Sequence, residues 1–225
     1  MTMTAIGERI TELRKELPEG VELVAVSKFH PSEAIMEAYE VGQRRFGESR
    51  VQELLAKQQT LPADIEWHFI GHLQTNKVRQ IMGRTSLIES VDTEKLLEYI
   101  DKESERAGVV TRVLMQLHVA REETKFGFYP EELLEYFRSR KFEHLKATHI
   151  CGVMGMASNT DDEERVREDF RKIAEVYQTI REDSSLGLTG FDTLSMGMSG
   201  DWPLAVSEGS NLIRVGTRIF GARQY

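Results

Sequence analysis

The chain has 225 residues, 40% hydrophobic and 29% charged, which is enough to bury a sizeable core in one large domain. A formal net charge of -8 argues against a protein that neutralises nucleic-acid phosphates with clustered Lys and Arg. No apolar run approaches the roughly 18 residues of a membrane-spanning helix. A single cysteine, Cys151, and an N-terminal segment unlike a signal peptide predict a cytoplasmic protein that does not act at membranes.

Short apolar, β-branched runs alternate with longer amphipathic stretches along the chain. An N-terminal helical pattern comes first. The amphipathic stretches after it span residues 31–42, 76–82, 93–108, 130–140 and 160–183. Ser32 is the expected cap of the first of these, and Gly108 the expected end of the third. The runs that read as strands are residues 22–28, 45–49, 66–71, 86–91, 112–119, 148–154, 193–197 and 212–215.

Strand and helix patterns that alternate without a break predict parallel strands joined by crossover helices. Eight such strands are the number that closes a (β/α)8 TIM-type barrel, an α/β fold, and we expect it to be one domain over residues 1–225. The alternative is an open, doubly wound sheet. It is disfavoured because no glycine-rich phosphate loop follows the first strand.

A lysine ends the first apolar run, VAVSK. The simpler interpretation is that the strand surfaces at Lys28, which then points into solvent before Pro31 begins the next helix. In the sharper one, Lys28 points into a pocket where desolvation lowers its pKa, leaving a neutral amine that can form a Schiff base. A barrel favours the second, because active sites in this fold lie at the C-terminal ends of the strands.

The loops that follow the seventh and eighth strands carry glycines and hydroxyls, in LSMGMSGDW and IRVGTRIFG. Barrels frequently bind phosphate at these two positions, so Ser195, Ser199, Gly216 and Thr217 are predicted to cradle an anion. For either loop alone, ordinary turn residues would be the better interpretation.

Arg214 lies inside the eighth strand, where an unpaired guanidinium would be costly. It is predicted either to pair with a carboxylate such as Glu208 or to face the barrel mouth, where it would donate to a ring nitrogen or a phosphate. His68 and His72 are four residues apart but flank a strand, so we expect no metal site. Cys151 is expected to pack rather than react, and Lys77 either meets an anion or is solvated.

Seven segments taken together resemble the pyridoxal phosphate homeostasis protein family. They are VAVSK, FGESRVQE, WHFIGHLQTNK, EETKFGF, CGVMGM, LSMGMSGDW and IRVGTRIFG, in order from near residue 21 to residue 221. The resemblance implies a single-domain barrel that binds pyridoxal 5′-phosphate (PLP) and is related to the N-terminal domain of alanine racemase. It also implies a role in vitamin B6 homeostasis, without dedicated catalytic turnover.

The resemblance also carries over site residues. Lys28 matches the lysine that holds PLP as a Schiff base, and Arg214 matches the arginine opposite the pyridine nitrogen. Ser49 and His118 stand where the family usually has Asn, and Lys125 is a candidate second lysine at the cofactor. The expected cofactor-binding set is Lys28, Ser49, Met154, Ser195, Met198, Ser199, Arg214, Gly216 and Thr217, with no catalytic residue and no metal ligand.

Two other functions stay open at this point. One is a PLP-dependent enzyme with weak amino-acid racemase activity; the other is a phosphate-binding barrel without aldehyde chemistry. Racemase chemistry of this type needs a second base from an additional domain, and the chain ends at Tyr225, so the non-catalytic function is preferred. We expect PLP as the only ligand and a monomer, with a weak dimer as the alternative.

Overall fold

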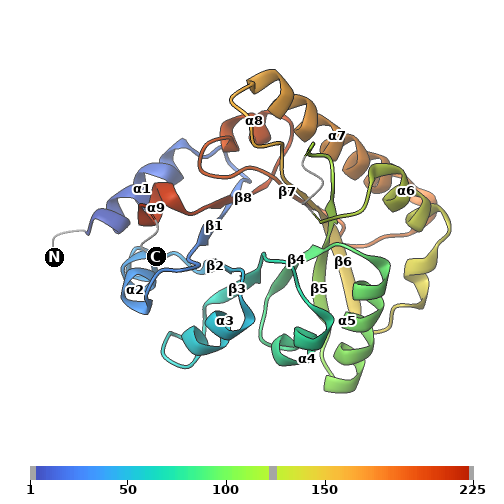
Figure 1. Cartoon of the computed structure of the whole chain (residues 1–225), viewed down its shortest axis with the longest axis horizontal. Helices are drawn as coiled ribbons and strands as arrows, with labels where there is room; N and C mark the ends of the chain where they lie inside the picture. Colours follow the sequence, from blue (N-terminus) through green and yellow to red (C-terminus); the bar gives the residue numbers. More distant parts are fainter. Residues whose placement is uncertain (1–3, 122–125, 223–225) are drawn as a thin grey trace.

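The computed structural model describes residues 4–121 and 126–222, and within these residues it confirms the predicted barrel. All the described strands are parallel and pair in chain order, and β8 returns to β1 to close the ring. Helices lie outside this ring (Figure 1). The strands are β1 (Glu22–Val26), β2 (Arg45–Glu48), β3 (Glu66–Phe69), β4 (Leu87–Val91), β5 (Thr111–Leu117), β6 (Thr148–Gly155), β7 (Thr193–Ser195) and β8 (Leu212–Val215).

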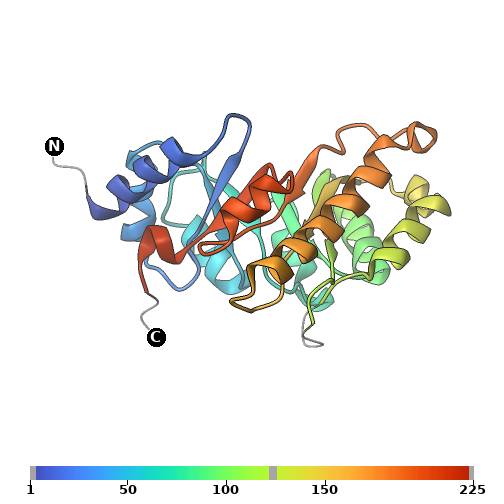
Figure 2. The same cartoon turned by 90° about the horizontal axis from the view of Figure 1, so that it is seen from above.

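Helices occupy the predicted amphipathic stretches, and further helices lie over residues 51–58, 202–207 and 217–220. The α-helices are α1 (Ala5–Glu16), α2 (Ser32–Glu40), α3 (Val51–Gln58), α4 (Val78–Ile81), α5 (Glu94–Ala107), α6 (Pro130–Arg138), α7 (Glu163–Glu182), α8 (Trp202–Ser207) and α9 (Thr217–Phe220). Short 3-10 helices are η1 (Thr75–Lys77), η2 (Lys141–His144) and η3 (Ser184–Leu186). Figure 2 shows α1, α2 and α9 grouped at one end of the molecule and α6 and α7 at the other.

Alternate residues of each strand serve two separate cores. One set faces the helices and joins a large outer cluster that includes Phe46, Trp67 and Ile213. The other set fills the inside of the barrel, where Val24, Leu114 and Met154 belong to a small apolar cluster. Because side chains alternate along a strand, residues separated by two positions continue the same inward series toward the barrel mouth.

The closure of the barrel joins the two ends of the chain. Val24 of β1 is in register with Arg214 of β8. Outside the strands, α1 packs beside α9: Arg9 donates to the Ile219 carbonyl at 3.1 Å, and Arg218 pairs with Glu16. The first and last described elements therefore hold each other in place.

The expected cap of α2 is wrong. Pro31 occupies the N-cap position and Ser32 is the first helical residue, so its hydroxyl does not cap the helix and lies 3.3 Å from that of Thr60. Proline fits here because its fixed φ suits a helix start. The predicted end of α5 is confirmed, since Gly108 adopts a left-handed φ of 67°. Among the described helices, none combines the length and hydrophobicity that crossing a bilayer requires.

The contact between β6 and β7 generates a test of the fold. Gly152 has a φ of 152°, and a Cβ placed on it would lie 1.8 Å from the Thr193 carbonyl oxygen. We expect Gly152→Ala to lower the free energy of unfolding by about 3 kcal/mol or more, because the strands must separate and the backbone is strained. Urea denaturation measures this. Gly200→Ala is the matched control, since nothing lies within 4 Å of its added Cβ, and equal losses in both variants would contradict this packing.

Candidate functional site

The turn after β1 brings Lys28 to the mouth of the barrel. The ladder continues one residue beyond the strand, because the Ser27 N–H donates to the Gly47 carbonyl at 3.0 Å. Ser27 is fully buried, and its side chain bonds to Glu48 on the helix-facing side. Alternation from the inward-facing Val24 therefore puts Lys28, which is half-buried, on the series that faces the barrel interior.

The loops after β7 and β8 meet beside this turn. The Ser199 hydroxyl accepts from the backbone N–H groups of Gly216 at 3.3 Å and Arg218 at 3.5 Å. A Cβ on Gly216 would lie 3.2 Å from the Val26 carbonyl, so this loop lies close against the end of β1. Both N–H groups thus point at one oxygen, that of the Ser199 hydroxyl. Converging backbone N–H donors of this kind suit the oxygens of a phosphate. Thr217, the first residue of α9, is exposed at the same place.

A buried polar network crosses the barrel interior below the mouth. Glu89 on β4 is fully buried and accepts from the Ser195 hydroxyl at 2.6 Å. Its other oxygen lies 2.7 Å from Nδ1 of His68, and Arg214 lies 3.6 Å from the carboxylate. Arg214 also donates to Ser195 and to the Gly155 carbonyl, the latter at 3.1 Å.

The predicted pairing of Arg214 with Glu208 is wrong. Glu208 pairs instead with Arg167 at 3.0 Å and with Arg171 at 3.5 Å, on the outside of the barrel. The inward orientation of Arg214 follows from its register with Val24, which points into the barrel. Glu89 is the carboxylate that the strand geometry brings opposite this arginine.

The charges in this network depend on one another. Burial raises the pKa of Glu89, but the hydrogen bond and charge of His68 and the charge of Arg214 outweigh it and lower that pKa below its ordinary value. Burial lowers the pKa of Arg214, and the charges of Glu89 and Asp201 oppose that shift. The carboxylate and the guanidinium thus keep each other charged in a site away from water.

The remaining predicted site residues surround the mouth at different depths. Met154 is 1% exposed and belongs to the interior cluster, whereas Met198 is 40% exposed beside Ser199. Ser49 follows β2 and is half-buried. Ser195 is fully buried and its hydroxyl is held by Glu89, so its contact with a phosphate stays a prediction.

Aromatic and imidazole rings form part of the rim. The ring of His72 stacks on Phe126 at 3.9 Å and pairs with Asp92 at 2.7 Å. His118, which ends the inward series of β5, lies 5.3 Å from the ring of Tyr129. Lys125 lies outside the described residues. In residues 4–121 and 126–222, no three His, Cys, Asp or Glu side chains are grouped to hold a metal ion.

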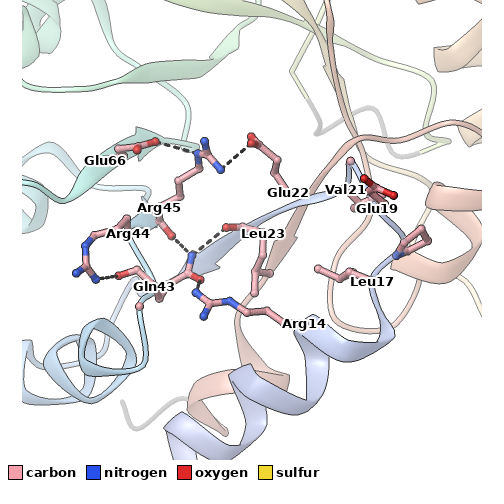
Figure 3. A pocket seen from close by; sticks show the side chains of 13 residues that line it. Arg14, Leu17, Glu19, Val21, Glu22, Leu23, Gln43, Arg44, Arg45 and Glu66 are labelled. Atoms are coloured by element: carbon pink, nitrogen blue, oxygen red, sulfur yellow. Dashed lines mark hydrogen bonds and ion pairs between the residues drawn. The ribbon is translucent and has the colours of Figure 1, made fainter.

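A hollow of about 580 Å³ lies at the opposite end of the barrel, between the end of α1 and the start of β2 (Figure 3). Its cations are paired within the protein: Arg45 bridges Glu22 and Glu66 at 2.9 Å each. Arg14 donates to the Val41 carbonyl and to the side chain of Gln43. At the N-terminal face of a barrel, such pairing stabilises the fold.

Glu89 is the member of the candidate site that the sequence analysis missed. A signal for it exists, since it is a lone acid inside the apolar run LIESV. Carboxylates are rarely buried without a partner, so this run could have indicated a buried cation elsewhere. The partner itself lies more than a hundred residues away along the chain, and only the closed barrel identifies it.

Comparison with known proteins agrees with this geometry. The family model "Alanine racemase, N-terminal domain" matches residues 1–224. A pyridoxal phosphate homeostasis protein of Aquifex aeolicus is 38% identical over 99% of this chain and 97% of its own length. One of Schizosaccharomyces pombe is 39% identical over 89% of this chain and 84% of its own. The chain belongs to the pyridoxal phosphate homeostasis protein family.

Solved structures of similar proteins share the fold. PipY of Synechococcus elongatus without PLP has a TM-score of 0.90 and 38% identity, covering 96% of this chain and 100% of that chain. PipY with PLP bound has a TM-score of 0.87. An alanine racemase of Clostridium difficile is 14% identical with a TM-score of 0.77, and 57% of that chain is covered, which relates the two by fold alone.

The buried network gives a stability prediction with a pH dependence. We expect Glu89→Gln to lower the free energy of unfolding near pH 7 by about 3 kcal/mol, because Arg214 keeps its charge and loses its counter-ion. The folded pKa of Glu89 is lowered, so this advantage of the wild type is present above the ordinary value of 4.5 and disappears as the pH falls below it.

Urea denaturation at several pH values checks this prediction. Glu66→Gln is the matched control, because its pair with Arg45 is about half exposed and should contribute under about 1 kcal/mol. A loss for Glu89→Gln that equals the control, or one that persists unchanged at low pH, would contradict the charged network.

Proposed function

We propose that residues 1–225 act as one PLP-binding unit that holds PLP covalently on Lys28 and releases it again, without dedicated catalytic turnover. One observation carries the proposal: Lys28 continues the inward series of β1 directly beside the loop whose N–H groups converge on Ser199. An amine and an anion cradle at one mouth match the two reactive ends of PLP, an aldehyde and a phosphate. The family membership supports the same ligand.

The covalent step needs only the amine of Lys28 and the aldehyde. The uncharged amine attacks the aldehyde carbon, a carbon–nitrogen double bond forms, and one water molecule leaves. Addition of water reverses the reaction. The half-buried position of Lys28 suits both directions, since it leaves the amine within reach of a ligand in the mouth and still admits water.

The loops after β7 and β8 would hold the phosphate. The backbone N–H groups of Gly216 and Arg218 and the hydroxyls of Ser199 and Thr217 supply donors on one side of the mouth. Ser195 is retained as a predicted phosphate contact. It lies at the end of β7, where its hydroxyl is also within reach of Arg214.

The deeper residues would contact the ring. Met154 would form part of the pocket wall, and the partly exposed Met198 would lie at the edge of the opening. Ser49 lies beside the mouth after β2. Arg214 would face the pyridine nitrogen from the end of β8, and its guanidinium is held by Glu89 and Gly155.

The pairing of Arg214 supports binding over catalysis. A guanidinium whose charge is stabilised by Glu89 does not readily give its proton to a pyridine nitrogen, so the ring would be a weak electron sink. The names of the relatives point the same way, since they describe PLP homeostasis. Turnover of amino acids by the purified protein, measured by chiral chromatography, would favour the racemase alternative instead.

The covalent role of Lys28 is directly testable. We expect wild-type protein to retain PLP after borohydride reduction, with the label on the peptide that contains Lys28, because reduction makes the carbon–nitrogen bond permanent. Lys28→Ala should lose that label while keeping its unfolding transition, since a half-buried side chain at a strand end contributes little packing. Lys95→Ala on α5 is the control. A wild-type label found on another lysine would contradict the proposal.

The proposed phosphate contacts of Ser199 and Ser195 can be tested separately. We expect Ser199→Ala to weaken PLP binding about tenfold and to leave pyridoxal, which lacks the phosphate, almost unchanged, since a hydrogen bond to a charged group is worth about 1.5–3 kcal/mol. Ser195→Ala is measured in parallel by fluorescence titration with both ligands. Loss of both ligands in equal measure would remove that serine from the phosphate site.

A further inference from the structure

A cluster of buried charges lies just behind Lys28, between the ends of β1 and β2 and helix α3. Lys57 of α3 is 7% exposed, and its ammonium lies 2.7 Å from Glu48 and 2.7 Å from Glu53. Glu48 is fully buried at the end of β2, and Glu53 is 21% exposed. We call these three residues the Glu48–Glu53–Lys57 cluster.

The cluster binds the backbone on both sides of Lys28. On the N-terminal side, Lys57 donates to the Ser27 carbonyl at 2.9 Å, and the Ser27 hydroxyl donates to Glu48 at 2.5 Å. On the C-terminal side, the Phe29 N–H donates to Glu53 at 2.6 Å. Both peptide neighbours of Lys28 are therefore held by the same three side chains.

The conformation of this turn needs such support. Phe29 has a φ of 67°, in the left-handed region that a large aromatic residue rarely adopts, at a cost of about 1–3 kcal/mol. The ring of Phe29 also lies 4.7 Å below the guanidinium of Arg50. The chain thus turns sharply directly after Lys28.

Stability alone does not explain why these charges are buried. Taking an ammonium and a carboxylate out of water costs several kcal/mol, and apolar side chains of similar volume commonly stabilise a fold as well or better. Burial raises the pKa of Glu48 to about 7, and the attraction and hydrogen bond of Lys57 oppose that shift without cancelling it. What the charges provide here is orientation of the turn, since Lys57 and Glu53 each bond to a backbone atom beside Lys28 and Glu48 bonds to the Ser27 hydroxyl.

We propose that Glu48, Glu53 and Lys57 are positioning residues, which fix the Lys28 amine in the orientation that captures an aldehyde. The inference rests on the proposed function and adds residues that never touch the ligand. The hydrogen bonds of the cluster go to the turn around Lys28, and the loops after β7 and β8 take part in none of them. Formation of the covalent bond and grip on the phosphate should therefore respond differently to its removal.

Glu53→Ala is the most informative variant. It removes the acceptor of the Phe29 N–H from a partly exposed site, so the helix and barrel should stay folded. We expect capture of PLP, followed as the rate at which borohydride-stable label appears on Lys28, to fall about tenfold or more, since small misplacements of a reacting group have effects of this size. Affinity for pyridoxine 5′-phosphate, which has an alcohol in place of the aldehyde, should stay within about twofold.

Two further variants and one control complete the test. Glu53→Gln keeps an acceptor for Phe29 and should recover much of the capture rate, whereas Lys57→Met removes the donor to Ser27 and should lose it. Gln52→Ala, an exposed change on the same helix, should behave as the wild type. Thermal unfolding of each variant accompanies the measurements, and Glu53→Gln together with Lys57→Met decides the matter if Glu53→Ala does not fold.

Two results would overturn the inference. An unchanged capture rate in the folded variants would remove the positioning role. An equal loss of PLP and pyridoxine 5′-phosphate would mean that the cluster only maintains the fold. Failure of the proposed function is distinguishable from both, because the wild-type protein itself would then show no reducible label on Lys28.

Discussion

The pairing of β8 with β1 is the constraint on which the whole site depends. It joins residues nearly two hundred positions apart, and it sets Val24 opposite Arg214. Lys28 lies four residues beyond Val24 and Gly216 two beyond Arg214, so the register places the lysine and the proposed anion-binding loop side by side at the mouth. A Cβ on Gly216 would lie only 3.2 Å from the Val26 carbonyl, so β1 and the loop after β8 are tightly packed, and the packing of α1 on α9 supports this contact from outside.

Two buried charge clusters flank that contact and act at different depths. The inner one joins Glu89 to Arg214 across the barrel, and the outer one joins Lys57 to Glu48 and Glu53 behind the first turn. Neither cluster is needed for stability alone, since apolar side chains of similar volume would stabilise the barrel as well. In the proposed function both would support a polar ligand, the Glu89–Arg214 pair from inside the barrel and the Glu48–Glu53–Lys57 cluster from behind Lys28.

The order of strands and helices could be predicted from the sequence better than the partners of the buried polar groups. Strand runs were visible because parallel strands buried on both faces are continuously apolar, and the order of elements then determined that Lys28 ends a strand. Boundaries shifted by one to a few residues, as at the end of β1, because the ladder ends in irregular turns. The cap at Ser32 was misplaced because proline at the same junction already supplies a helix start.

Partners of buried charges were harder to predict, for a physical reason. Glu208 is near Arg214 in sequence, but the alternation of β8 sends the arginine inward, and Glu208 lies outside the barrel on the far side of that strand. Which carboxylate pairs with Arg214 depends on the curvature and register of the whole barrel. A local sequence pattern does not contain this information. The same holds for Lys57, whose spacing of four from Glu53 indicates an ordinary helix pair and gives no sign of Ser27.

The proposed reversible binding follows from the contrast between a supported turn and an open mouth. Hydrogen bonds hold Ser27 and Phe29 on the two sides of Lys28, so less backbone entropy would be lost when Lys28 bonds to an aldehyde. Met198 in the loop after β7 and Thr217 after β8 are, by contrast, exposed. In the proposed function, water that reaches the carbon–nitrogen bond on this side of the mouth would hydrolyse it, so the protein would need both a prepared amine and access for the water that releases PLP.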